Sequence, residues 1–219
     1  MPELVFLLDV DNTLLDNDFV KDDLDRRMGG FLQPDEERRF WDLYETVRHE
    51  RDVVDFPLTL ERFHQGCRDE QAFERLSRLL NEYRFDRHLY PNALETIHHL
   101  RQFGVAAVVS DGDQVFQPRK IAEAGITEAV GGRVFITTHK EQSIAEVLEQ
   151  IPADRYVMVD DKRRILSALK SNYPDKFGTV HVLQGHYAHA DEDLKPDPDI
   201  EVAAIGDLRK YGREAFLGG

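Results

Sequence analysis

Hydrophobic residues near the start of the chain form one short unbroken run that ends at two acidic residues. Residues 4–8 are all apolar, and Asp9 and Asp11 follow them with Val10 in between. A run of this length and composition predicts a strand that is buried on both faces, as strands of a parallel sheet are. Open α/β sheets place their ligand sites at the carboxyl ends of such strands, so the two acids are expected to lie at a functional site.

Apolar residues between about residue 16 and residue 84 recur at helical spacing, and strand alternation is absent from this stretch. Gly29 and Gly30 are expected to end a first helix, Pro34 to begin a second, and Pro57 to begin a third. A fourth helix is predicted from the apolar positions 73, 76, 79, 80 and 83. Residues 16–84 are therefore predicted to form a helical bundle that interrupts the rest of the fold.

From Tyr90 onward, short apolar runs alternate with amphipathic stretches. Strands are predicted at 105–109, 133–137, 156–159, 179–183 and 202–205, with helices between most of them. This alternation is typical of a parallel sheet covered by helices on both faces. The predicted organisation is an α/β domain made of residues 1–15 and 85–219, with an all-helical domain inserted at 16–84.

Composition narrows the classes of function and partner. The 219-residue chain has 41% hydrophobic and 32% charged residues, as ordinary soluble proteins do. Its formal charge of -14 repels nucleic acid, which is not expected as a partner. The single Cys67 excludes an internal disulfide and a cysteine-based metal cluster. No apolar leader or membrane-spanning run is recognisable, so a cytoplasmic location without membrane contact is expected. The sequence carries no sign of the oligomeric state.

The polar residues that follow the predicted strands are expected to meet, because the carboxyl ends of parallel strands lie along one edge of the sheet. They are Asp9, Asp11, Ser110, Asp160 and Asp161. So many carboxylates would repel one another strongly unless a cation lay among them, and ligand sets made only of oxygen suit Mg²⁺. A magnesium site in turn points to phosphate chemistry.

Roles for these residues follow from their chemistry. An ionised Asp9 could attack phosphorus, while Asp11 could donate a proton to the leaving oxygen and later take one from water. The Ser110 hydroxyl and the backbone amides of Asp111 and Gly112 could hold phosphate oxygens, and a lysine should neutralise the charge that builds up. This reasoning predicts a small phosphorylated molecule as the substrate.

The residues Asp9-Val10-Asp11-Asn12-Thr13 resemble the first motif of the haloacid dehalogenase-like (HAD) superfamily, Asp-x-Asp-x-Thr/Val. Ser110 resembles the second-motif Ser/Thr, a lysine the third motif, and Asp160-Asp161 the acidic fourth motif. The resemblance implies a Rossmann-like parallel-sheet core, and it implies that residues 16–84 are a helical cap of the first type, which encloses a small substrate.

By this resemblance Asp9 is the nucleophile and Asp11 the acid and base. Mg²⁺ is expected to be bound by Asp9, by Asp11 through its backbone carbonyl, and by the Asp160-Asp161 pair, with Asp161 the better candidate for the direct ligand. With an acid at the position of Asp11, the motif resembles that of the phosphoryl-transfer branch of the family, since the dehalogenase branch lacks this acid. One departure is Asp111, where many members carry Asn.

Two lysines could serve the third motif. Lys120 lies in a predicted helix about ten residues beyond the strand tip, which could place its backbone about 10 Å or more from the sheet edge. Lys140 directly follows the predicted strand 133–137 and precedes a helix, in a loop at the catalytic edge. Lys140 is therefore expected to bond the nucleophile and the phosphate, and Lys120 to be a solvated cation.

The sequence predicts a magnesium-dependent phosphatase that acts through a phospho-Asp9 intermediate. A phosphomutase acting on a sugar phosphate and a phosphate-binding relative without turnover remain as alternatives.

Several other polar side chains have two interpretations. Thr13 could begin a turn or serve the site. Arg48, like each of the other predicted cap arginines, fits a solvated helix face better than a substrate contact. His186 and His189 are spaced as metal ligands can be, but surface or packing roles are favoured. The other cap arginines considered are Arg26, Arg27, Arg51 and Arg62.

Overall fold

A parallel sheet forms the centre of the computed structural model, which describes residues 2–190 and 193–217. Its strand order is β3-β2-β1-β4-β5-β6, and each neighbouring pair is parallel. The central strand β1 is buried along its whole length, as its apolar run predicts. The strands are β1 (Leu4–Leu8), β2 (Val105–Asp111), β3 (Val134–Thr137), β4 (Arg155–Asp160), β5 (Phe177–Val182) and β6 (Ile200–Val202).

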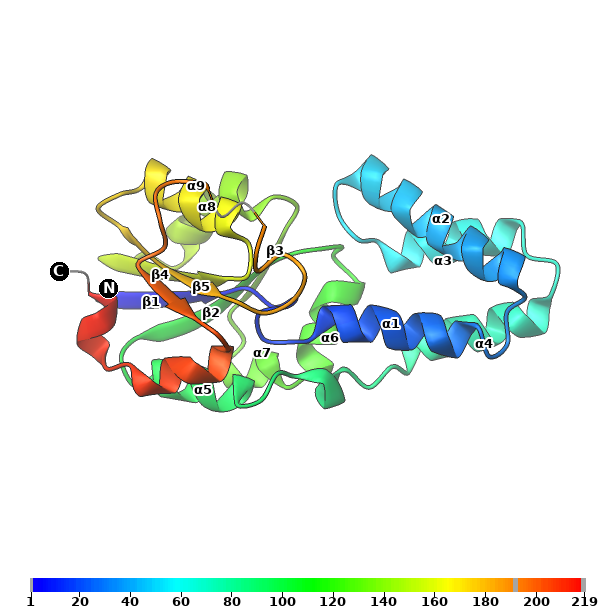
Figure 1. The fold of residues 1–219 in the computed structure, drawn as a ribbon, viewed down its shortest axis with the longest axis horizontal. Helices are drawn as coiled ribbons and strands as arrows, with labels where there is room; N and C mark the ends of the chain where they lie inside the picture. The colour runs from blue at the N-terminus through cyan, green and yellow to red at the C-terminus, as the bar shows by residue number, and fades with distance from the viewer. Residues whose placement is uncertain (1, 191–192, 218–219) are drawn as a thin grey trace.

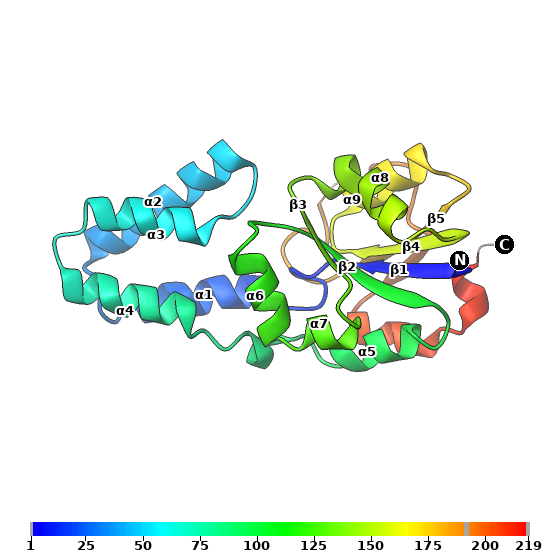
Figure 2. The same cartoon turned by 180° about the vertical axis from the view of Figure 1, so that it is seen from behind.

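Helices cover both faces of the sheet, because alternate residues of each strand point to opposite sides. Leu4, Phe6 and Leu8 belong to one buried cluster, while Val5 and Leu7 belong to the other. The second cluster packs against α8 (Lys140–Gln150) and α9 (Arg163–Asn172), which lie together above the sheet in Figure 1. The opposite face is covered by α5 (Ala93–Leu100), α6 (Phe116–Glu123), α7 (Ile126–Ala129) and two 3₁₀ helices, Ile205–Lys210 and Arg213–Phe216 (Figure 2).

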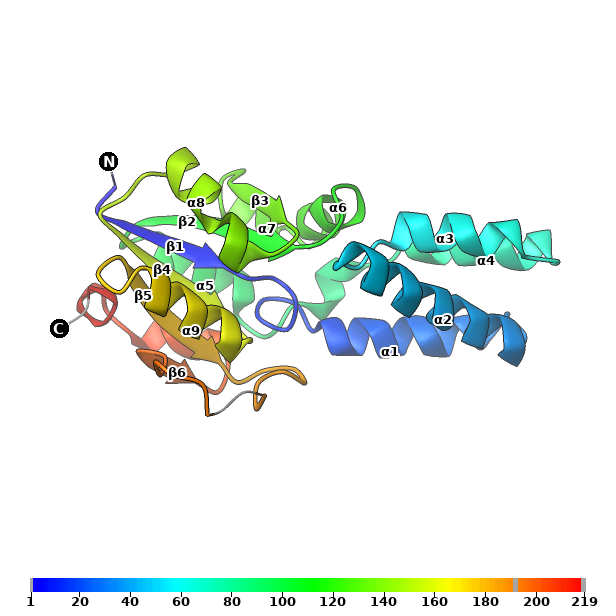
Figure 3. The ribbon, with the colours of Figure 1, turned by 90° about the horizontal axis from the view of Figure 1, so that it is seen from above.

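Four further helices extend away from the sheet beyond its carboxyl edge (Figure 3). Acidic N-caps help to start them: the side chain of Asp16 accepts from the Phe19 amide, and that of Asp55 from the Leu58 amide. A 3₁₀ turn, Phe85–His88, leads back to the α/β domain. These helices are α1 (Asn17–Met28), α2 (Pro34–Arg51), α3 (Phe56–Gln65) and α4 (Glu70–Asn81).

The predicted fold class is confirmed: a Rossmann-like α/β core carries an inserted helical cap. The domain limits at residues 15/16 and 84/85 stay a prediction. One predicted strand is wrong in extent, since β6 covers Ile200–Val202 and a 3₁₀ helix begins at Ile205. Strand pairing does not continue there, because the Ile205 amide donates to the Gln184 side chain at 2.6 Å. Within the described residues, no helix combines the length and the apolar character that crossing a membrane requires.

Gly104 provides a test of how tightly β1 is packed. An added Cβ would lie 2.3 Å from the Leu4 carbonyl oxygen, which the central strand holds in place. Gly104→Ala is therefore expected to lower the free energy of unfolding by about 1–3 kcal/mol, measured by urea denaturation.

Gly66→Ala is the matched control, since its Cβ would meet only the end of the flexible Arg39 side chain. It should cost clearly less than Gly104→Ala. Equal losses for the two variants would contradict this account of the packing around β1.

Candidate active site

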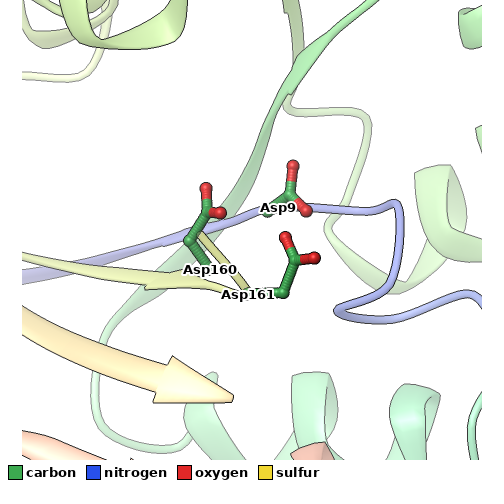
Figure 4. A group of neighbouring side chains, drawn as sticks. All are labelled: Asp9, Asp160 and Asp161. Carbon is green, nitrogen blue, oxygen red and sulfur yellow. The ribbon is translucent and has the colours of Figure 1, made fainter. Parts of the chain in front are cut away.

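Three aspartates meet at the carboxyl edge of the sheet. Asp9 directly follows β1, Asp160 ends β4 and Asp161 comes next, so adjacent strands bring them together (Figure 4). One carboxylate oxygen from each lies within 4.8 Å of the others, and all three side chains are buried. The expectation that these acids converge is met in the described structure.

Lys140 supplies the positive charge inside this cluster. It is the first residue of α8, directly after the β3 loop, and only 1% of it is exposed. Its Nζ donates to Asp9 Oδ1 and, at 2.9 Å, to Asp160 Oδ2. Burial alone would lower the pKa of Lys140, but the carboxylates of Asp160 and Asp9 outweigh burial and raise it. The ammonium therefore stays charged between two carboxylates.

The two acids at the end of β4 have different surroundings. Asp160 accepts from Lys140 and, at 2.9 Å, from the Lys162 backbone amide. Both Asp161 oxygens are buried, and neither has a hydrogen-bond partner among the described residues. Burial, together with the neighbouring Asp160 and Asp9, raises the pKa of Asp161 to about 9. A buried carboxylate without a donor is costly, so Asp161 fits the role of a ligand to a divalent cation.

Thr13 completes the surroundings of Asp9. Its buried hydroxyl donates to Asp9 Oδ2 at 3.0 Å, while Lys140 occupies Oδ1. The turn after β1 brings Thr13 back, with its amide donating to the Val10 carbonyl at 3.2 Å. Both oxygens of Asp9 are thus oriented by the chain itself.

Asp11 lies apart from the three-aspartate cluster, and its side chain faces α6. Lys120 Nζ donates to Asp11 Oδ1 at 2.5 Å, and Gln117 Nε2 donates to Oδ2 at 3.1 Å. Gln117 also donates to Ser110 Oγ at 2.9 Å. The second-motif serine and the second aspartate of the first motif are therefore joined through one glutamine.

The expectation that Lys120 is a solvated cation is wrong. It is 4% exposed and paired with Asp11, because α6 begins only at Phe116 and a lysine in its second turn is long enough to reach back to the sheet edge. Gln117 was also missed. Their i, i+3 spacing, which places both side chains on one helix face, is the signal that could have found them.

The second-motif loop corrects one further expectation. The Gly112 amide donates to the Thr137 carbonyl at 3.0 Å, so it is taken up by the β2–β3 pairing and is not free for a phosphate oxygen. Asp111 accepts from the Thr137 hydroxyl at 2.7 Å and lines the cleft described below. Ser110 is buried beside Gln117.

A cleft of about 380 Å³ lies between the α/β domain and the cap. Asp11, Asp111 and Lys162 line it from the sheet side, and Tyr44 and Arg48 of α2 line it from the cap. Arg48 does more than lie on a solvated helix face, since its Nη2 bonds the Tyr187 hydroxyl at 3.2 Å. Asp11 and Asp111 thus lie beside a space that a small molecule could enter from between the domains.

Several of the other candidate side chains have structural partners. His186 Nδ1 lies 2.6 Å from Asp18 Oδ1, and within residues 2–190 and 193–217 the only metal-type cluster is the aspartate one. A metal-binding role for His186 and His189 is therefore not supported. Arg26 and Arg27 pair with Asp23, and Arg62 pairs with Glu50.

The sequence profile of the haloacid dehalogenase-like hydrolases matches residues 4–172. A haloacid dehalogenase-like hydrolase from Burkholderia xenovorans LB400 is 41% identical, with a TM-score of 0.87 over 97% of this chain and 98% of that one. L-2-haloacid dehalogenase from Xanthobacter autotrophicus shares the fold at 20% identity, with a TM-score of 0.57 over 94% of this chain and 96% of that one.

The magnesium-bound HAD-type hydrolase YfnB from Bacillus subtilis also shares the fold, at 16% identity and a TM-score of 0.57 over 95% of this chain and 97% of that one. Among curated proteins, no relative matches the sequence. The profile match covers well over half of the chain and includes the strands that carry the acids. The chain therefore belongs to the haloacid dehalogenase-like hydrolases and is an enzyme of that family.

Proposed function

We propose that this hydrolase is a magnesium-dependent phosphatase that cleaves a small phosphomonoester through an aspartyl-phosphate on Asp9. The observation that carries the proposal is the second acid, Asp11, held at the cleft by Lys120 and Gln117 and separate from the buried cluster. A dehalogenase also needs a nucleophilic carboxylate, but the halide that it releases is a stable anion. The alkoxide released from a phosphomonoester needs a proton, and Asp11 is placed to supply it.

The proposed reaction has two steps. An Asp9 oxygen attacks phosphorus, the ester P–O bond breaks, and the leaving oxygen takes a proton from Asp11. Water then attacks the phosphorus of the aspartyl-phosphate, gives its proton to Asp11, and releases phosphate and the free Asp9 carboxylate. Lys140 and Thr13 hold Asp9 in position in both steps.

The three buried aspartates fit a divalent cation. Asp9, Asp160 and Asp161 would hold it, with the carbonyl of Asp11 as a further oxygen ligand that the family resemblance implies. When bound, the cation neutralises phosphate charge and relieves the repulsion among the carboxylates. The unpartnered oxygens of Asp161 are the strongest support for this assignment.

The alternatives predict different products. A phosphomutase would return the phosphoryl group to an isomer of a sugar phosphate and release little free phosphate, whereas a binding relative would release none. Measuring both phosphate and isomer over a panel of phosphorylated metabolites separates the three functions.

Asp9→Asn should abolish phosphate release while the fold is kept. The change removes the nucleophile, and Lys140 keeps its partner Asp160. We expect kcat to fall by about 10⁴-fold or more, measured as phosphate release, with an unchanged far-UV circular dichroism spectrum. Substantial remaining activity in a homogeneous preparation would place the nucleophile elsewhere.

Substitution of each of the two buried lysines should lower activity in a different way. Lys140→Ala removes the donor to the nucleophile, so kcat/KM should fall about 100-fold or more, about 2.7 kcal/mol, for every substrate. Lys120→Met removes a hydrogen-bond donor from the proton donor Asp11, so kcat for an alkyl phosphate should fall about tenfold. The fall in kcat should be smaller for an aryl phosphate, whose leaving group needs no proton.

Rates for one alkyl and one nitrophenyl phosphate, measured in both variants, make this comparison. If the loss in Lys120→Met did not depend on the leaving group, its proposed link to Asp11 would not hold.

Asp161 and Asp160 should differ in stability and metal binding. A carboxyl whose pKa is raised on folding holds its proton more tightly in the folded state than in the unfolded state. Asp161 is such a group, so it makes the metal-free protein less stable as pH rises from about 4 to about 9. Asp161→Asn removes that cost and should raise the Tm of the metal-free protein at pH 8, while the stabilisation by added Mg²⁺ disappears.

Asp160→Asn is the matched comparison. It breaks the pair with Lys140 and should lower the Tm. Thermal unfolding with and without Mg²⁺ gives both answers. A larger loss of magnesium response in Asp160→Asn than in Asp161→Asn would exchange the roles assigned to these two acids.

A further inference from the structure

Several lysine and arginine side chains line the cleft, and the inference drawn from them rests on the proposed phosphatase function. Most cationic side chains along the cleft already have acidic partners. Lys21 lies 3.3 Å from Glu45, and Arg164 lies 2.7 Å from Glu141. Arg163 pairs with Asp197, a residue outside the cleft. Each of these three cations has an acidic partner in the chain itself, and Lys21 shares its partner Glu45 with Arg48.

Lys162 is different. Its Nζ forms no hydrogen bond or ion pair within the described parts of the chain, and it lies over the ring of Tyr187, 5.1 Å from the centroid. Once a divalent cation is bound, that cation and Lys140 together balance the three buried carboxylates. Lys162 is then a cation without an acidic partner of its own among the described residues that line the cleft.

Tyr187 joins Lys162 to a second cation from the cap. Its hydroxyl receives a hydrogen bond from Arg48 Nη2 at 3.2 Å, and the only acid paired with Arg48 in the described structure is Glu45, at 3.4 Å. Arg48 and Lys162 thus contact one tyrosine from opposite domains, and all three line the cleft. The tyrosine hydroxyl can also donate its own proton to an anion.

The loop that presents Tyr187 is firmly positioned. His186 bonds Asp18 at the start of α1 through both its backbone amide, at 2.8 Å, and its ring. Gly185 has a φ of 69° and lies so close to Asn12 that an added Cβ would be 2.4 Å from the Asn12 Cβ. Gly185 and His186 are therefore held against the turn and the helix start that follow Asp11, and they position Tyr187 in the cleft that Asp11 also lines.

We propose that Arg48, Lys162 and Tyr187 bind a second anionic group of the substrate, a carboxylate or a second phosphate, at the far end from the phosphate that is cleaved. The preferred substrates are then small phosphomonoesters with two anionic ends. One cation comes from the cap and the other from the core, so such a substrate also links the two domains across the cleft.

The experiment uses a homologous series of ω-phosphooxy alkanoates, each paired with its primary amide and with the bisphosphate of the corresponding diol. The amide has the same length and lacks only the charge. At the best chain length we expect kcat/KM for the carboxylate, the bisphosphate or both to exceed that for the amide by about tenfold or more. Which of the two is favoured identifies the second anion.

Arg48→Gln and Lys162→Gln should each reduce the ratio of acid to amide toward one. Arg38→Gln is the matched control, because Arg38 lies exposed on the same helix as Arg48 but outside the cleft. This substitution removes the same charge and should leave the ratio of acid to amide unchanged. Equal kcat/KM for charged and neutral esters at every length would overturn the second-anion site and leave the phosphatase function standing. So would an unchanged ratio in Arg48→Gln. Absence of phosphate release from every ester would instead overturn the proposed function, and this inference with it.

Discussion

The structure depends on one electrostatic constraint: three carboxylates, from Asp9, Asp160 and Asp161, are buried together at the edge of the sheet beside the ammonium of Lys140. Like charges this close are strongly unfavourable in a poorly solvated site, and one ammonium cannot balance all three. Burial, together with the neighbouring Asp160 and Asp9 carboxylates, raises the pKa of Asp161. In the proposed phosphatase a bound divalent cation would resolve the charge imbalance, and the phosphate of the substrate would bring the negative charge that such a cation stabilises.

The sheet makes this arrangement possible, because β1 lies at its centre with β2 and β4 on either side. One motif lies at the end of each of these three strands, so residues more than 150 positions apart come together without long loops. The cap is inserted soon after the first motif. Its helices therefore start beside the site, and the cleft between the domains begins at Asp11 itself.

Much of the fold and the central part of the site could be predicted, because they depend on strand ends. An apolar run followed by an acid fixes where a side chain emerges, which was enough to bring together Asp9, Asp160 and Asp161 and to favour Lys140 over Lys120 as their partner. What could not be predicted depends on the path of long side chains. Lys120 reaches Asp11 because α6 begins only at Phe116, so a lysine in its second turn can extend back to the sheet edge.

The same limit applies to contacts between segments that are remote in sequence. Whether the Gly112 amide is free depends on its pairing with Thr137, and the role of Arg48 depends on a tyrosine 139 positions away. Neither follows from local periodicity. The roles assigned to the site residues remain proposals, and the central one is covalent catalysis by Asp9. Acid quenching of the enzyme during turnover of a phosphomonoester labelled in its phosphoryl group, followed by peptide mapping, tests it most directly. The account predicts label on the peptide that contains Asp9, and on Asp9 itself; phosphate release accompanied by label on another residue, or by no labelled peptide at all, would contradict it.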